Sequence, residues 1–199
     1  ITSTQLAALS DTQLAALTSD QIAALSTSAL AGLSTTRLLS LTTRQFDALT
    51  TAQVAALTTT QIASLTGTAI SLLGPNELNA LSSSQLAAFS ATQLAALSAT
   101  QIAAISTSAI TGLTSTQVSK LTSSQIAALS TTQIAAMNTA QISGLTDTQA
   151  QALSTAQLNA LSATQIAALS TTAVRSFSTT EFAALSAQQM AALAGTQVQ

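Results

Sequence analysis

An eight-residue repeat runs through this chain of 199 residues without one insertion or deletion. We number the octad so that residues 162–169, SATQIAAL, fill positions one to eight. Position five then falls on every eighth residue from Leu6 onward, and of these 25 residues only Ala150 is not large and apolar. Position eight, which starts at Ile1, is large and apolar without exception. Loops that do not pack against other repeats accept insertions easily. The strict register of this chain therefore predicts that each repeat packs on its neighbours.

The length of the repeat limits the backbone conformations that can bury both apolar positions. Eight residues turn an α-helix by about 800°, so an apolar pair drifts by roughly 80° per repeat and one continuous helix gains no apolar stripe. In a β-strand positions five and eight face opposite sides, whereas residues three apart share one face of a helical turn. The octad therefore predicts one short helix per repeat. A β-solenoid is the alternative, because Thr, Ile and Val suit strands.

Polar residues mark where each of these short helices begins. Position one is Ser or Thr in 22 of 25 repeats, and position four is Gln in 18 and Glu in two. This pattern is the capping box, in which the hydroxyl accepts from the backbone N–H three residues on and the Gln side chain reaches back to the cap N–H. In the segment GPNEL, Gly74 takes the cap position and Pro75 the first helical position, where proline is favoured.

The remaining positions indicate which side of each helix faces its neighbours. Position seven is nearly always Ala, Gly or Ser, which predicts a close contact between helices, whereas position six admits charged and amide residues and predicts a solvated edge. Leu72 and Lys120 break the rule at position seven, which predicts a local bulge or a contact site. Arg37 and Arg44 lie in the first helical turn, where the helix dipole favours acidic residues instead.

Together these positions predict an all-α solenoid, a superhelical coil of very short capped helices around an aliphatic core. Such short helices do not persist alone in water, so several repeats must fold together. We expect residues 1–199 to form one uninterrupted array of about 25 repeats. Both ends stop inside a repeat without a polar capping unit, so we expect a segment of a longer array or a subunit that joins end to end.

Composition excludes several classes of function. The chain has no His, Cys, Trp or Tyr, so the usual metal ligands and the usual nucleophile and base of catalytic triads are missing. Carboxylate pairs could act as acid and base, but Asp11 and Asp20 lie in first-turn positions that suit helix capping. The sequence therefore predicts no enzyme, no catalytic, cofactor-binding or metal-binding residue, and no small-molecule substrate.

Nucleic-acid binding and membrane spanning are not expected either. The four basic residues lie far apart, there is no aromatic interleaving and the net charge is -2, so the electrostatic footprint of a nucleic-acid surface is missing. The apolar runs are only a few residues long, whereas a spanning helix needs about 20 apolar residues.

Octads such as SATQIAAL (162–169) and TSSQIAAL (122–129) resemble the Ser/Thr/Gln/Ala/Leu octad arrays of very large bacterial secreted or surface proteins, which are described as adhesin-like or haem-utilisation proteins. The resemblance implies an extracellular stalk, spacer or filament segment that partners itself or its flanking repeats. It does not carry the haem function, because Met137 and Met190 are the only possible axial ligands and both occupy apolar core positions.

Two further functional hypotheses remain beside this structural one. Position three is Thr in 14 repeats, so a regular coil displays threonines at fixed spacing, as an ice-binding surface would; examples are Thr92, Thr100, Thr164 and Thr172. Alternatively, the Ser/Thr/Gln surface binds a glycan or another protein. Measurement of thermal hysteresis would test the first of these, and a glycan array or pull-down the second.

Overall fold

The computed structural model describes residues 2–193 of the chain. Within this part the chain folds into 24 α-helices of four to six residues and contains no strand. The prediction of an all-α solenoid with one helix per octad is confirmed, and the β-solenoid alternative is not supported.

The first twelve helices are α1 (Ser3–Ala8), α2 (Asp11–Ala15), α3 (Ser19–Ala23), α4 (Thr27–Ala31), α5 (Thr35–Leu39), α6 (Thr43–Asp47), α7 (Thr51–Ala55), α8 (Thr59–Ser64), α9 (Gly67–Ser71), α10 (Pro75–Ala80), α11 (Ser83–Ala87) and α12 (Ala91–Ala96). The others are α13 (Ala99–Ala104), α14 (Thr107–Ile110), α15 (Ser115–Lys120), α16 (Ser123–Ala127), α17 (Thr131–Ala136), α18 (Thr139–Ser143), α19 (Asp147–Gln151), α20 (Thr155–Ala160), α21 (Ala163–Ala167), α22 (Thr171–Arg175), α23 (Thr179–Ala184) and α24 (Ala187–Ala192).

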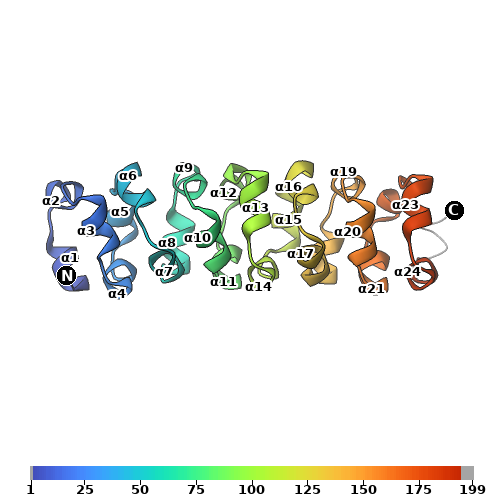
Figure 1. Ribbon diagram of the computed structural model, residues 1–199, viewed down its shortest axis with the longest axis horizontal. Coiled ribbons are helices and arrows are strands. Elements are labelled where there is room, and N and C mark those ends of the chain that lie inside the picture. Colours follow the sequence, from blue (N-terminus) through green and yellow to red (C-terminus); the bar gives the residue numbers. More distant parts are fainter. Residues whose placement is uncertain (1, 194–199) are drawn as a thin grey trace.

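The helices wind into a superhelix with the shape of a straight rod (Figure 1). Helices three places apart in the chain lie against each other, from α1 with α4 to α21 with α24. Side-chain hydrogen bonds also connect helices four places apart, as between Gln45 of α6 and the carbonyl of Leu14 in α2. One superhelical turn therefore holds between three and four helices.

The capping pattern predicted from the sequence is present almost throughout the described part. In 23 of its 24 helices the side chain at position one accepts a hydrogen bond from the N–H at position four, and in 18 the full capping box forms. The exception is α10, which starts at Gly74 with Pro75 as its first residue. Between α13 and α14 the chain is extended at Ile105, which is position eight, and at the cap Ser106 that follows it. The described octads turn the chain in this way without a residue at positive φ.

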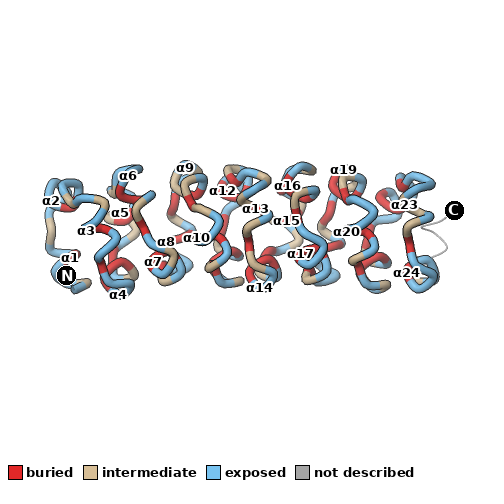
Figure 2. The backbone as a smooth tube through the Cα atoms, in the orientation of Figure 1, coloured by how far each residue is buried: buried red, intermediate tan, exposed pale blue. Residues whose placement is uncertain are grey.

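The core is a continuous column of the large side chains at positions five and eight. Figure 2 shows buried residues along the whole rod, interspersed with exposed ones in every repeat. Ala150, which is small at position five, is fully buried as well. Met137 is buried, but Met190 is 41% exposed, so the prediction that both methionines lie in the core is wrong for Met190. Met190 belongs to α24, and the described chain has no later helix to cover it.

Position seven makes the close helix-to-helix contact that its small residues predict. A Cβ added to Gly112, which follows α14, would lie 2.0 Å from the carbonyl oxygen of Ser83 in α11. At Gly144, the C-cap of α18, it would lie 2.5 Å from the carbonyl oxygen of Ser115 in α15. The polar residues at position six are exposed, as expected: Asp47, Asn79, Gln151, Asn159 and Arg175. No helix between residues 2 and 193 combines the length and the hydropathy that crossing a bilayer requires.

Candidate functional site

A column of glutamine side chains, buried except for the half-buried Gln101 and Gln117, connects successive turns of the superhelix. In each of them the amide nitrogen Nε2 donates to the backbone carbonyl oxygen of the residue 28 positions earlier, at N–O distances of 2.5–2.9 Å. We call this column the glutamine ladder. Its fourteen described members are Gln45, Gln53, Gln61, Gln85, Gln93, Gln101, Gln117, Gln125, Gln133, Gln141, Gln149, Gln157, Gln165 and Gln189.

Each ladder glutamine satisfies backbone groups at the ends of two different helices. Oε1 of Gln61 accepts from the cap N–H of Thr58 at 2.9 Å, which closes the N-terminus of α8. Nε2 of the same side chain donates to the carbonyls of Leu30 at 2.9 Å and Leu33 at 2.8 Å, at the C-terminus of α4 one turn earlier. Because the ends of a short helix leave most of its backbone groups unpaired, this arrangement lets the rod bury helix ends without a large penalty.

Sequence reasoning identified the first of these roles and missed the second. A capping box takes Glu as readily as Gln, and negative charge suits a helix N-terminus. Position four nevertheless holds 18 Gln and only two Glu. That imbalance is the signal that could have revealed a need for N–H donors, because a carboxylate has none.

Position four departs from Gln at several places, and each departure changes the ladder. In α5, Arg37 stands at this position, and its guanidinium donates to the carbonyl of Leu9, the same 28-residue step that glutamine makes. It also lies 3.6 Å from the carboxylate of Asp11, which explains an arginine in the first turn of a helix. Nε of Arg37 is buried and has no partner among the described residues.

Glu77 occupies the ladder position in α10, where it can accept hydrogen bonds but not donate to carbonyls. Its Oε1 accepts from the hydroxyl of Thr51 at 2.6 Å. A cavity of about 140 Å³ lies beside it, lined by residues of α6, α7 and α10 and their connections: Phe46, Asp47, Leu49, Val54, Leu72, Leu73, Gly74 and Glu77.

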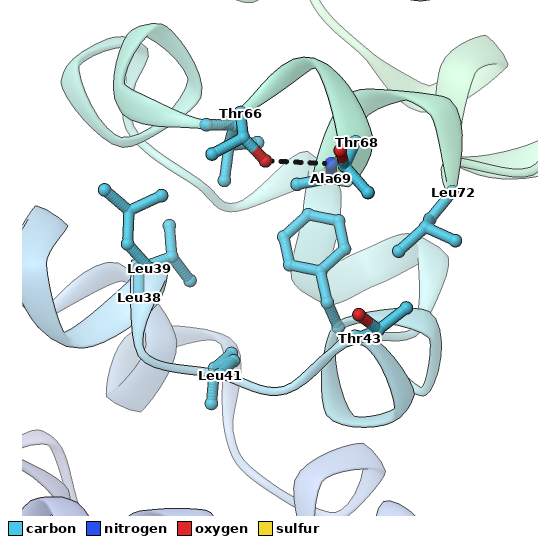
Figure 3. A pocket seen from close by; sticks show the side chains of 10 residues that line it. Leu38, Leu39, Leu41, Thr43, Thr66, Thr68, Ala69 and Leu72 are labelled. Carbon is cyan, nitrogen blue, oxygen red and sulfur yellow. Dashed lines mark hydrogen bonds between the residues drawn. The ribbon is translucent and has the colours of Figure 1, made fainter.

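The ladder is also interrupted at Ala69 of α9, and a cavity of about 80 Å³ lies there. Figure 3 shows Leu38, Leu39 and Leu41 on one side of this cavity and Thr66 and Ala69 on the other. Leu38, Leu39 and Leu41 are the residues whose carbonyls a glutamine at position 69 would reach, by analogy with Gln61 and its partners. Three other alanines at position four, Ala29, Ala109 and Ala173, are fully buried, whereas Ala69 is only half-buried.

Leu72 explains why the chain does not close over this gap. It stands at position seven of α9, and Thr43 of α6 stands opposite it; both line the cavity. The contact between α6 and α9 is sparser than that between α9 and α12. Leu72 therefore contributes a wall of the cavity at Ala69, and the bulge expected from it stays a prediction.

Other residues of interest from the sequence do not gather into a site. Asp11 pairs with Arg37, Asp20 is exposed, and Lys120 is exposed at position seven of α15. Within residues 2–193, no three Asp or Glu side chains come together as a metal site would require. The threonines at position three, such as Thr92 and Thr164, are exposed.

Comparison with known families identifies a repeat family. The family model of the ALTTAQ repeat matches residues 1–27, 70–107, 101–131, 123–155 and 164–195, which together span more than half of the chain. No curated protein matches the chain in sequence.

Proposed function

Since this chain belongs to the ALTTAQ repeat family and folds as a stack of equivalent short helices, we propose that it is a structural repeat protein that acts as a stalk or spacer. Catalysis has no part in this function. The rod would set the distance between whatever precedes it and whatever follows it.

The glutamine ladder is the observation that supports this proposal best. Each ladder member takes the carbonyls of the preceding turn and leaves its own helix to be completed by the following turn, as Gln133 does with Ile105 and Gln165 does with Met137. The stack can therefore be extended by any number of octads without a new kind of contact. Repeat proteins of this kind have energetics that add up from neighbour to neighbour.

The same contact supports self-association as the mode of partnering. Each described ladder glutamine joins its helix to one of an earlier turn, as Gln61 does with Leu33, and a repeat of another copy would present the same carbonyls. We propose end-to-end stacking on this basis.

Solution scattering tests the spacer function. Duplicating residues 122–177 adds seven whole octads, close to two superhelical turns, in register with the ladder. We expect the maximum dimension of the particle to rise in proportion to the added octads while its cross-section stays constant. An increase in cross-section without an increase in length would contradict a rod-like spacer. A duplication of residues 122–175, which breaks the octad register, serves as the control and should reduce the helix content.

We further propose that the rod lies outside a bacterial cell. This proposal rests on the resemblance of octads such as residues 162–169 to the arrays of bacterial secreted or surface proteins. Antibody labelling of intact host cells tests it. Signal on intact cells is expected, and signal that appears only after lysis would contradict it.

An ice-binding or glycan-binding surface is the alternative function. The exposed threonines at position three favour it, but successive octads point in different directions around the rod, so they spread over several faces (Figure 1). Thermal hysteresis in solutions of the purified protein would support the ice-binding alternative over the spacer.

A further inference from the structure

Leu39, Leu41 and Thr66 line the cavity at Ala69, and their backbone groups occupy places that are paired at the ladder positions. Among the described residues, the carbonyl oxygens of Leu39 and Leu41 accept no hydrogen bond and the N–H of Thr66 finds no acceptor. In a neighbouring octad the corresponding groups are the carbonyls of Ala31 and Leu33 and the N–H of Thr58, and all three are bonded to Gln61.

The ladder therefore shows which chemistry these groups take, because it repeats the same arrangement fourteen times with one kind of partner. The carbonyl oxygens need an N–H donor and the Thr66 N–H needs an acceptor. A carboxylate would satisfy Thr66 but would face the two carbonyls without a proton to give them. An ammonium group would satisfy the carbonyls but offers no acceptor. A primary carboxamide supplies both.

The size and the walls of the cavity limit the rest of the ligand. Its volume of about 80 Å³ is roughly half that of an engineered cavity that accepts benzene, about 150 Å³, so it holds a group of only a few non-hydrogen atoms. Leu65, Phe46 and Leu72 contribute apolar walls. Leu39 is 44% exposed and lies at the rim, where it can cover the stem of a ligand.

We propose that the cavity at Ala69 is a binding site for a primary carboxamide on a short aliphatic stem. The amide nitrogen donates to the carbonyls of Leu39 and Leu41, and the amide oxygen accepts from the N–H of Thr66. A free small amide and a glutamine side chain carried by a larger partner share this chemistry. Leu72 keeps the site open, and Ala69 leaves room for the ligand.

Nuclear magnetic resonance titration of the full chain with propionamide tests the proposal. We expect saturable shifts, with millimolar affinity, at the carbonyl carbons of Leu39 and Leu41 and at the amide of Thr66. Propionate, propylammonium and N,N-dimethylpropionamide are controls of similar size, and each lacks one of the two required hydrogen-bonding abilities. Equal shifts with any of these three would overturn the proposal, and so would the absence of a saturable shift with both propionamide and the glutamine peptide described below.

Two variants place the binding at this cavity. In Ala69→Gln the side chain should occupy the cavity, so the shifts caused by propionamide should disappear. Ala109→Gln makes the same substitution at another interruption of the ladder and should leave them unchanged. Persistence of the shifts in a folded Ala69→Gln protein, as judged by its circular dichroism spectrum, would show that propionamide binds elsewhere and would refute the site.

A second arm distinguishes the two sources of the amide. The peptide Gly-Gln-Gly is compared with Gly-Glu-Gly. Both peptides are blocked at their ends with groups that are not primary amides, so the glutamine side chain carries the only primary amide. Shifts with propionamide show that a free amide suffices, and shifts with the glutamine peptide alone show that the site needs a side chain on a longer partner. Either result supports a carboxamide site, and shifts with neither ligand, or equal shifts with both peptides, would overturn it.

Discussion

Two stretches of the rod differ in how completely the glutamine ladder is built. From α15 to α21 all seven helices have Gln at position four, whereas from α5 to α10 only three of six do. Both stretches keep the large apolar residues at positions five and eight, except for Ala150 in the first stretch. The cavities beside Ala69 and Glu77 both lie in the second stretch.

This comparison separates two contributions to the fold. α7 still packs on α10 although Glu77 gives α10 no ladder donor, so the apolar column holds these two helices together without one. The ladder determines how tightly the helix ends close between turns. Where it is interrupted and position seven is large, the rod opens locally.

The largest expected loss of stability comes from replacing one ladder donor by an acceptor in the complete stretch, α15 to α21. Nε2 of Gln133 donates to the carbonyl of Ile105 at 2.6 Å, and its Oε1 accepts from Ser130 at 2.7 Å. Gln133→Glu keeps the acceptor but places an unpaired buried charge against carbonyl oxygens, which should cost about 3–5 kcal/mol of unfolding free energy at pH 7. Urea unfolding followed by circular dichroism measures this loss.

The pH dependence of the same variant sharpens the test. Burial against carbonyls raises the pKa of the introduced carboxyl in the folded state, and its neutral form can donate to Ile105. The folded state then binds more protons than the unfolded state above the unfolded pKa of about 4.3. The variant should therefore be close to the native protein in stability below that pH and lose stability as the pH rises.

Gln5→Glu is the matched control, because Gln5 is exposed and makes only a capping box. We expect this substitution to change the free energy of unfolding by less than about 0.5 kcal/mol. A similar loss in both variants would argue against the ladder.

A smaller loss is expected where helices three apart touch most closely. Gly112→Ala places a Cβ 2.0 Å from the carbonyl oxygen of Ser83, so α14 and α11 must separate, at a cost of about 1–3 kcal/mol. At Gly67 the nearest atom to an added Cβ is that of Ala96, at 3.3 Å. Gly67→Ala should therefore change the unfolding free energy by less than about 1 kcal/mol. Equal effects at the two glycines would show that the close contact is unimportant.

A gain in stability is expected from repairing the interrupted stretch. Ala69→Gln restores the hydrogen bonds to Thr66, Leu39 and Leu41, which should add about 1–2 kcal/mol. Leu72→Ala lets α9 approach α6, so combining the two substitutions should give more than the sum of their separate effects, by about 0.5 kcal/mol or more. Strict additivity in this double-mutant cycle would mean that Leu72 does not hold the cavity open.

The smallest effect is expected at Arg37, which already makes the 28-residue contact. Arg37→Gln should keep a donor for Leu9 and gain an acceptor for the N–H of Ser34, at the expense of an exposed ion pair with Asp11 that is worth little. The net gain should be about 0.5–1 kcal/mol and should grow with salt, because screening weakens the native ion pair. A loss that shrinks with salt would show that the ion pair contributes more than the cap.

The sequence was sufficient to predict each helix, because everything that defines a helix lies within one octad. Ser162 and Gln165 are three residues apart, and their mutual hydrogen bonds require only a local helical turn. The same holds for Pro75 in the first turn of α10 and for the buried pairs at positions five and eight.

The sequence was not sufficient to predict the contacts between turns. The octad period is the same whether three, four or more helices make one turn, so nothing local indicates that Gln165 meets Met137, 28 residues earlier. The cavity at Ala69 was beyond prediction for the same reason, since it depends on Leu72 facing Thr43 across turns. Met190 was misplaced because its burial depends on a later helix that the local pattern does not describe.

The ladder also has a direction, which bears on how the rod would form during translation. A helix that leaves the ribosome has its cap within its own octad, but its last carbonyls receive their donor only when a glutamine 28 residues later has been made. Nascent chains fold from the N-terminus, so completion would follow synthesis at a constant lag of about one turn. No step would have to wait for a distant segment, and a very long array would assemble as readily as a short one.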